Sequence, residues 1–290
     1  MKKALLIILI LIAALSIAFG VIFFNMVLNR DVLGLKPYAG LNSSEYEWVT
    51  IENDGLVLQG YLKQNPTSDC FVILINGYTG SGRTMLEYAD YYTQNGYNIL
   101  IIDHRAHGNS EGKFCTMGIK ETGDVLSWID FLITINPNAK IVLHGISMGA
   151  ATTMTVSGSN SLPSNVIASI EDCGFTSIYE EFTHQIKERS GITVRALLRV
   201  SSLYAKLRAG FFYGEDSPIE AVRESNVPIL FIHGTHDGFV PFEMQKRLYD
   251  AANCEKEIVE IDGAGHVMSH HVDPEKYWSA VDSFLKKYVD

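Results

Sequence analysis

Short runs rich in apolar residues recur along the chain and alternate with longer segments of mixed polarity. The apolar runs cover residues 70–76, 98–103, 139–146, 166–172, 227–234 and 256–262. Runs of this length with few polar positions are typical of strands that are buried on both faces. The segments between and after them have the length of helices, at 82–95, 116–135, 147–158, 242–252 and 274–289. The alternation predicts an α/β fold, a mostly parallel sheet with helices on both faces.

Two runs of alternating polar and apolar positions precede this pattern, at residues 46–53 and 56–64. They meet at Asp54 and Gly55, and an Asp-Gly pair between two such runs is a strong hairpin signal. We therefore expect an antiparallel hairpin that extends the predicted sheet to eight strands.

One segment interrupts the alternation, at about residues 176–216. It contains two or three helical stretches and no strand. An insertion of this kind, placed over the carboxyl edge of a parallel sheet, is where a lid lies. We therefore predict a small helical lid over 176–216.

The first thirty residues differ from the rest because Lys2 and Lys3 are followed by no charge before Arg30. As a helix, this apolar stretch is long enough to cross the roughly 30 Å hydrocarbon core of a bilayer. We predict a transmembrane signal anchor at residues 1–30, in contact with the membrane through residues 4–28.

A cleaved secretory signal is the alternative interpretation, with Ala18 and Gly20 as the small residues before the cut. The apolar run continues past that point to residue 28, which is longer than the usual hydrophobic region of a signal peptide. Residues 31–44 are then a polar, glycine-containing linker, and residues 45–290 form one folded domain.

Charges on either side of the anchor predict its orientation. Lys2, Lys3 and the terminal amine outweigh the flanking Arg30, Asp31 and Lys36, so the short tail is expected inside the cell. The protein is thus predicted to be a single-pass cell-membrane protein whose folded domain is extracytoplasmic.

Composition excludes some classes of partner. The chain has 290 residues, of which 47% are hydrophobic, so it can bury a large core. A net charge of −10 argues against nucleic acid, which requires a clustered basic surface. The four cysteines are too widely spaced for a zinc site or a redox CxxC motif, and buried thiols are the simplest expectation.

Ser147 lies between Gly145 and Gly149, where the apolar run 139–146 gives way to a helical segment of small residues. A serine flanked in this way fits a strained strand-to-helix turn that exposes its hydroxyl at the carboxyl edge of the sheet. The pattern also arises by chance at a tight helix start. The buried strand predicted just before Ser147 favours a nucleophilic serine over a chance match.

A neutral serine is a poor nucleophile and requires a base together with a group that orients the base. Asp237 follows the run 227–234, and His266 follows the run 256–262. Both therefore belong to the same predicted sheet edge as Ser147. The chain order Ser147, Asp237, His266 matches that of a known class of serine hydrolase sheet.

With these residues in place, the chain resembles the α/β-hydrolases, and within them the serine aminopeptidase-like and monoacylglycerol-lipase-like branch. The resemblance covers roughly residues 45–289 and includes the segments "NGYTGS" (76–81) and "DHRAHGNSEG" (103–112). It implies an α/β-hydrolase fold with an eight-stranded sheet and a helical lid. It also implies backbone N–H groups of Tyr78 and Met148 as oxyanion donors. Asn76 departs from the family, where many members have His.

Other polar residues offer alternative candidates for the orienting acid and for metal ligands. Asp172, at the end of run 166–172, could orient the base in place of Asp237. A metal cluster of His236, His270 and His271 would leave the serine without a base and lacks a known ligand spacing, so we expect no metal and no cofactor. The remaining candidates are expected to pack or to hold loops: His144, His233, Asp103, Arg105 and His107.

The predicted activity is that of a serine hydrolase that cleaves a carboxylic ester, of lipid origin in one interpretation, through an acyl-enzyme on Ser147. The partner is then a small-molecule ester or amide. Cleavage of an amide or a peptide N-terminal bond by the same triad is the second hypothesis. A non-catalytic ligand-binding domain and an acyl transferase are further alternatives, since a fold does not prove an activity.

Overall fold

The computed structural model describes residues 2–192 and 195–289. Its eight-stranded sheet has the order β1-β2-β4-β3-β5-β6-β7-β8. β1 pairs with β2 and β2 with β4 in antiparallel fashion, and all other neighbours are parallel. The predicted mostly parallel sheet of eight strands is confirmed. The strands are β1 (Glu47–Asn53), β2 (Leu56–Lys63), β3 (Cys70–Ile75), β4 (Asn98–Ile102), β5 (Lys140–Ile146), β6 (Val166–Asp172), β7 (Ile229–Gly234) and β8 (Lys256–Ile261).

The first hairpin turns at the predicted residues. Asp54 and Gly55 both have positive φ, 54° and 73°, and Asn53 pairs directly with Leu56. Two successive residues with positive φ give the turn whose twist matches that of the flanking strands, and Asp-Gly accommodates it with little strain.

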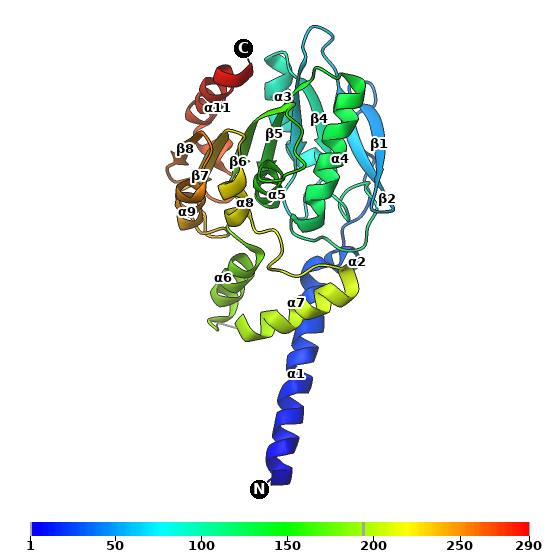
Figure 1. Ribbon diagram of the computed structural model, residues 1–290, viewed down its shortest axis with the longest axis vertical. Coiled ribbons are helices and arrows are strands. Elements are labelled where there is room, and N and C mark those ends of the chain that lie inside the picture. Colours follow the sequence, from blue (N-terminus) through cyan, green and yellow to red (C-terminus); the bar gives the residue numbers. More distant parts are fainter. Residues whose placement is uncertain (1, 193–194, 290) are drawn as a thin grey trace.

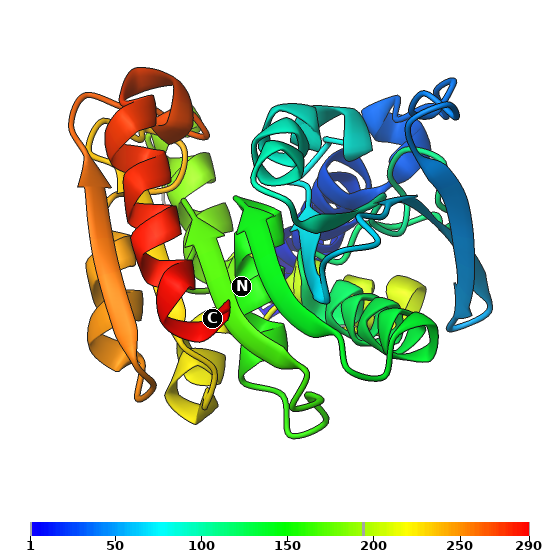
Figure 2. The same ribbon diagram turned by 90° about the horizontal axis from the view of Figure 1, so that it is seen from above.

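Helices cover both faces of the sheet (Figures 1 and 2). α3 (Leu86–Gln94) and α11 (Pro274–Val289) pack on one face through residues such as Tyr92 and Phe284. α4 (Ile119–Ile135) packs on the other through Trp128 and Leu132. The remaining elements of the sheet layers are η1 (Gly82–Met85), α5 (Met148–Ser157), α8 (Pro218–Glu224), α9 (Glu243–Ala251) and α10 (Ser269–Val272).

The segment predicted as a lid forms two helices, α6 (Ile178–Ser190) and α7 (Arg195–Ala209). Ser177 caps α6 by accepting a hydrogen bond from the Glu180 N–H, and Gly191 ends it with a φ of 69°. Both are standard solutions for the unpaired backbone groups at helix ends. The two helices lie below the carboxyl edge of the sheet (Figure 1).

The N-terminal segment forms one long helix, α1 (Lys2–Leu28), which projects from the body beside α7 (Figure 1). Among the described residues it is the one helix long and apolar enough to cross a membrane. Its first part is exposed, whereas Gly20, Phe24 and Leu28 are buried against the body. α2 (Arg30–Leu33) follows, and Arg30 donates hydrogen bonds to the carbonyls of Gly108 and Ser110. The first residues of the predicted linker 31–44 therefore form a helix, α2, that is attached to the loop after β4 through Arg30.

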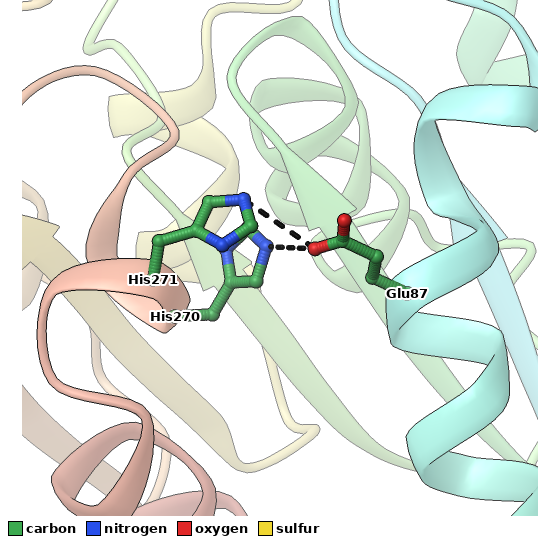
Figure 3. Close-up of side chains that lie close together, drawn as sticks. All are labelled: Glu87, His270 and His271. Atoms are coloured by element: carbon green, nitrogen blue, oxygen red, sulfur yellow. Dashed lines mark hydrogen bonds and ion pairs between the residues drawn. The ribbon is translucent and has the colours of Figure 1, made fainter.

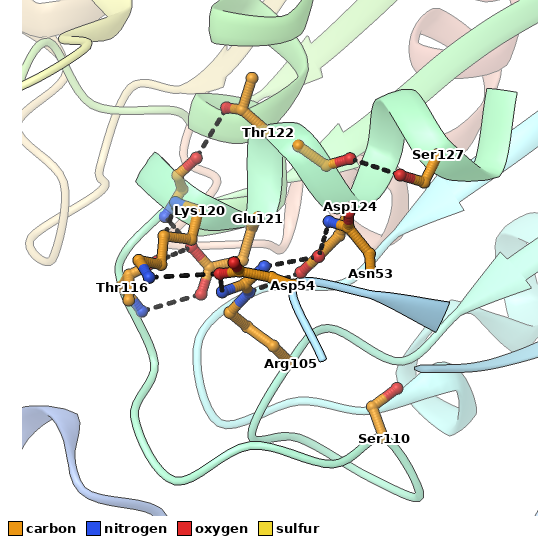
Figure 4. A network of polar contacts seen from close by, with 12 residues as sticks. Asn53, Asp54, Arg105, Ser110, Thr116, Lys120, Glu121, Thr122, Asp124 and Ser127 are labelled. Atoms are coloured by element: carbon orange, nitrogen blue, oxygen red, sulfur yellow. Dashed lines mark hydrogen bonds and ion pairs between the residues drawn. The ribbon is translucent and has the colours of Figure 1, made fainter. Parts of the chain in front are cut away.

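A buried polar network joins the hairpin, the loop after β4 and α4 (Figure 4). Arg105 donates two hydrogen bonds of 2.6 Å to Asp124 and a third, of 3.2 Å, to Asp54. Glu121 accepts hydrogen bonds from the N–H groups of Thr116 and Gly118. Because these charges are paired and hydrogen-bonded, they fix the loop between β4 and α4.

Candidate active site

Ser147 stands at the turn from β5 to α5 with φ 54° and ψ −116°, a strained conformation for a residue with a side chain. The neighbouring glycines make the turn possible. A Cβ on Gly145 would lie 2.1 Å from the carbonyl oxygen of Gly149, and one on Gly149 would lie 2.1 Å from that of Ile75. Any side chain at either position would force the strand and the helix apart.

The three predicted residues lie together at the carboxyl edge of the sheet. His266 Nε2 is 2.9 Å from the Ser147 hydroxyl, and His266 Nδ1 is 2.7 Å from Asp237 Oδ2. Asp237 comes from the loop after β7 and His266 from the loop after β8, so the parallel strands deliver all three. The distances are those of a nucleophile, a base and an orienting carboxylate.

Asp237 is held as an anion by its surroundings. Its Oδ1 accepts hydrogen bonds from the N–H groups of Phe239 and Val240, at 2.8 and 2.9 Å. Burial by itself would raise the pKa of Asp237, but hydrogen bonds from His233 and His266 outweigh it and lower the pKa well below its usual range. The carboxylate can therefore orient His266 at any pH near neutrality.

Asp172, the alternative candidate for the acid that orients the base, is hydrogen-bonded to another residue. Its Oδ2 accepts a hydrogen bond of 3.1 Å from the Tyr277 hydroxyl, and its backbone oxygen accepts one of 2.8 Å from the Ser147 N–H. Burial raises the pKa of its carboxyl to about 6. The side chain of Asp172 thus binds Tyr277, and its backbone oxygen stabilises the turn at Ser147.

The expected oxyanion donors flank the serine. Met148 is the first residue of α5, so its N–H has no acceptor within the helix. Tyr78 lies in the loop after β3, where a Cβ on Gly77 would lie 3.2 Å from the Ser147 Cβ. His107 Nε2 accepts a hydrogen bond of 3.1 Å from the next N–H, that of Thr79. The buried Asn76 donates to the Gly77 carbonyl at 2.9 Å, so its amide also fastens this loop.

Comparison with known proteins agrees with this geometry. Residues 66–170 match the family model described as serine aminopeptidase, S33. The esterase Pf2001 of Pyrococcus furiosus superposes with a TM-score of 0.71 over 88% of this chain and 100% of its own, at 25% identity. The chain thus has the α/β-hydrolase fold. The prediction of a hydrolase of the serine class is thereby confirmed.

Two relatives of this α/β-hydrolase match much of its length. The uncharacterized protein YqkD of Bacillus subtilis is 28% identical and covers 100% of this chain and 99% of its own. An uncharacterized membrane protein of Saccharomyces cerevisiae, YNL320W, is 25% identical over 83% of this chain and 79% of its own. The yeast protein is described as a membrane protein, and this chain has in α1 a helix long and apolar enough to cross a membrane.

A cavity of about 460 Å³ opens in front of Ser147. Its lining is largely apolar, as in many small-molecule sites. Besides Ser147 and Ser190, its polar residues include Glu181, Gln185 and Arg189, which recur every fourth residue along one face of α6. Sequence reasoning missed these residues because nothing in a helical segment of mixed polarity marks the face that turns toward the serine. It also missed the part of the wall contributed by α1: Phe23, Met26 and Val27.

Glu181 is the buried acid of this cavity. Burial raises the pKa of its carboxyl to about 8, although a hydrogen bond of 2.9 Å from Gln185 favours the charged form. At pH 7 the cavity that contains Ser147 therefore holds a mainly neutral carboxylic acid.

Cys173 is a further neighbour of the site. Its Sγ lies within 4.8 Å of the interacting atoms of Asp237 and His266. Burial raises the pKa of this thiol well above its ordinary value, so it stays protonated and does not compete as a thiolate. All four cysteines of the hydrolase are free.

Of the three histidines considered as metal ligands, His270 and His271 lie together, with ring centroids 3.9 Å apart, and His236 is not part of their cluster. His270 and His271 on α10 face Glu87 of α3, at 3.3 and 3.4 Å (Figure 3). The other ring nitrogen of His270 hydrogen-bonds to the Tyr88 hydroxyl at 2.9 Å, whereas His236 is exposed beside Thr235. His144 is buried between Tyr92 and Tyr277. Catalysis without a metal or cofactor stays a prediction.

Proposed function

We propose that the protein hydrolyses a carboxylic ester through an acyl-enzyme on Ser147. The observation that carries this proposal is the continuous hydrogen-bond chain from the Ser147 hydroxyl through His266 to Asp237, with distances of 2.9 and 2.7 Å. A protein that only bound a ligand would not need this arrangement beside a cavity.

The reaction runs in two halves. His266 Nε2 takes the hydroxyl proton as Ser147 Oγ attacks the ester carbonyl, and the tetrahedral oxyanion accepts hydrogen bonds from the N–H groups of Tyr78 and Met148. The C–O bond to the alcohol then breaks as His266 returns the proton to the leaving oxygen. Water, activated by His266, attacks the acyl-enzyme and releases the acid and free Ser147. Asp237 holds the imidazole throughout.

The cavity supports an ester in preference to a peptide N-terminus. An aminopeptidase needs a negative charge that pairs with the ammonium group of its substrate. The buried acid of the cavity, Glu181, is neutral at pH 7, and the remaining walls are mainly apolar. These features suit an acyl chain.

Aminopeptidase activity is the second candidate. The family model named for serine aminopeptidases and the position of Glu181 in the cavity favour it. Because the pKa of Glu181 is about 8, such an activity would rise as the pH passes 8 and the carboxyl ionises. Ester cleavage would show no such requirement.

Labelling with a fluorophosphonate probe tests the nucleophile. We expect the wild type to be labelled and Ser147→Ala to be inert. Ser190→Ala is the matched control, because Ser190 lies on the same cavity without contacting the triad. A folded wild type that stays unlabelled would instead support a non-catalytic binding domain.

A substrate series separates the remaining candidates. p-Nitrophenyl esters are compared with aminoacyl p-nitroanilides at pH 7 and pH 9. Turnover of the anilides alone would replace the esterase proposal by the aminopeptidase one. Rapid transfer to an added alcohol, at the expense of hydrolysis, would indicate an acyl transferase.

The cellular arrangement that we propose is a single-pass anchor, α1, with the hydrolase domain outside the cytoplasm. Lys2 and Lys3 precede the apolar helix and favour an inside N-terminus. Protease added to intact cells should then degrade the domain. Protection of the domain until the cells are lysed would reverse the orientation.

A further inference from the structure

The anchor helix forms part of the wall of the catalytic cavity. Phe23, Met26 and Val27, all in the last two turns of α1, line the same cavity as Ser147. The Tyr78 hydroxyl also donates a hydrogen bond to the carbonyl of Val27. α1 is therefore tied to the loop that is proposed to bind the oxyanion, which a simple tether would not require.

Packing against α7 fixes this part of α1. A Cβ on Gly20 would lie 3.0 Å from the backbone nitrogen of Ser201, so the two helices cross with their backbones close together. One turn later, the ring of Phe24 lies 5.2 Å from that of Tyr204. Phe23 packs edge-on against Phe182 of α6, with ring centroids 5.3 Å apart. The wall is therefore held from two sides.

The contact between α1 and α7 also indicates where the bilayer surface lies. Large apolar side chains of α1 from Leu5 to Ile17 are more than half exposed, as expected of a helix surrounded by lipid. α7 runs across α1 (Figure 1) and exposes Leu203 and Leu207 at 56% and 76%. Exposed cations accompany these leucines on α7: Arg195, Arg199, Lys206 and Arg208. A helix with this mixture suits the interface between acyl chains and anionic headgroups.

The cavity lies just above that level. Phe23 to Val27 follow Gly20 by three to seven residues, or about 5 to 10 Å along the helix axis. Met26 and Arg189, which line the cavity, are both exposed. The cavity wall therefore reaches the surface at the last turn of α6 and the last two turns of α1, so we place its mouth between these helices and near the membrane interface.

We propose that the acyl chain of the substrate enters from the bilayer between α1 and α6 and lies against Phe23, Met26 and Val27. The substrate is then a membrane-resident ester of a long-chain acid, with its polar end on the α6 side near Arg189. This inference rests on the proposed ester hydrolysis at Ser147. It makes α1 a determinant of specificity as well as an anchor.

The first test is chain-length selectivity in the full-length protein, purified in detergent. Val27→Phe adds bulk to the wall and should lower kcat/KM for p-nitrophenyl palmitate by about 10-fold or more. Its kcat/KM for p-nitrophenyl acetate should stay within about twofold, because the short chain does not reach the wall. Leu11→Phe is the matched control, since Leu11 is exposed and lies about 18 Å from Phe23 along the helix axis, and should change neither value.

Met26→Trp provides a second variant at an exposed position of the same wall, should Val27→Phe fold poorly. Equal effects on both esters, or none on either, would overturn the inference. Wild-type hydrolysis of the acetate and fluorophosphonate labelling report on the proposed function separately. Their loss would reject ester hydrolysis itself.

The second test concerns the route of entry. The protein is reconstituted into phosphatidylcholine vesicles, and a fluorogenic long-chain ester that does not exchange between vesicles is placed in the same vesicles or in separate ones. We expect hydrolysis at least about 10-fold faster in the shared vesicles, since lateral entry needs the ester in the membrane of the enzyme. Equal rates in the two arrangements would exclude entry from the bilayer.

Discussion

His233 places its Nε2 3.2 Å from Asp237 Oδ2, the same oxygen that lies 2.7 Å from His266 Nδ1. One carboxylate oxygen is therefore shared by two imidazoles. Burial alone would lower the pKa of His233, but the hydrogen bond to Asp237 and the nearby Glu171 raise it. The same Nε2 also lies 3.1 Å from the Val240 carbonyl. The sequence predicts only a packing or hydrogen-bonding histidine at this position, and from these contacts we expect His233 to position Asp237.

Replacing His233 should therefore impair catalysis without weakening substrate binding. For His233→Leu we expect kcat to fall by about 10- to 100-fold with little change in KM, because a charge-assisted hydrogen bond contributes about 1.5–3 kcal/mol. His236→Leu, at an exposed position of the loop that follows β7, should behave as wild type. Steady-state kinetics on p-nitrophenyl acetate measure both. A change in KM alone would contradict a positioning role.

The two acids near His266 should differ greatly in importance. Asp237→Asn removes the acceptor that fixes the imidazole tautomer, and such a change costs about 10⁴-fold in kcat in serine proteases with the same triad. Asp172→Asn should cost far less than this, since its side chain bonds to Tyr277. The ratio of the two kcat values decides the assignment, and a larger loss at residue 172 would reverse it.

Much of this site could be predicted because parallel strands bring their carboxyl ends to one edge. Ser147, Asp237 and His266 each follow a strand that the sequence predicts, so their meeting depends on the parallel sheet. The expectation that the strand before His266 is buried on both faces was wrong, because β8 is a partly exposed edge strand. The contribution of α1 could not be predicted. Its residues are apolar on every side, so no periodicity distinguishes Phe24, which is buried against the body, from Met26, which is exposed. Contacts such as His270 with Glu87 join segments far apart in sequence and leave no local pattern.

The serine turn should tolerate no added methyl group on its helical side. A Cβ on Gly149 would meet the carbonyl oxygens of Ile75 and Asn76 at 2.1 and 2.7 Å. We expect Gly149→Ala to lower the free energy of unfolding by about 3 kcal/mol or more. Gly123→Ala in α4, where the added Cβ would lie 3.7 Å from Asn53 Nδ2, should instead raise it by about 0.5–1 kcal/mol. Urea unfolding compares the two, and equal losses would show that steric contact at the turn is not the cause.

Stability should also depend on pH through the buried Glu171 at the end of β6. Burial raises the pKa of its carboxyl from 4.5 to about 8, against the opposing effect of His233. Between these values the unfolded chain loses a proton that the folded protein keeps, so the contribution of Glu171 to stability falls as the pH rises. Each unit of pKa difference corresponds to about 1.4 kcal/mol.

Glu171→Gln removes this proton exchange while it keeps an acceptor for the Gly174 N–H, which donates to Glu171 at 2.9 Å. The free energy of unfolding of the variant, relative to wild type, should therefore increase between pH 5 and pH 8. Asp172 and Glu181 also have raised pKa values and are present in both proteins. Because the charge of Glu171 also acts on Asp172 and His233, the measured pH dependence reports the change of this whole group. Glu52→Gln, at an exposed position of β1, is the control and should show a constant difference. A constant difference for Glu171→Gln as well would mean that this carboxyl is ionised in the folded protein.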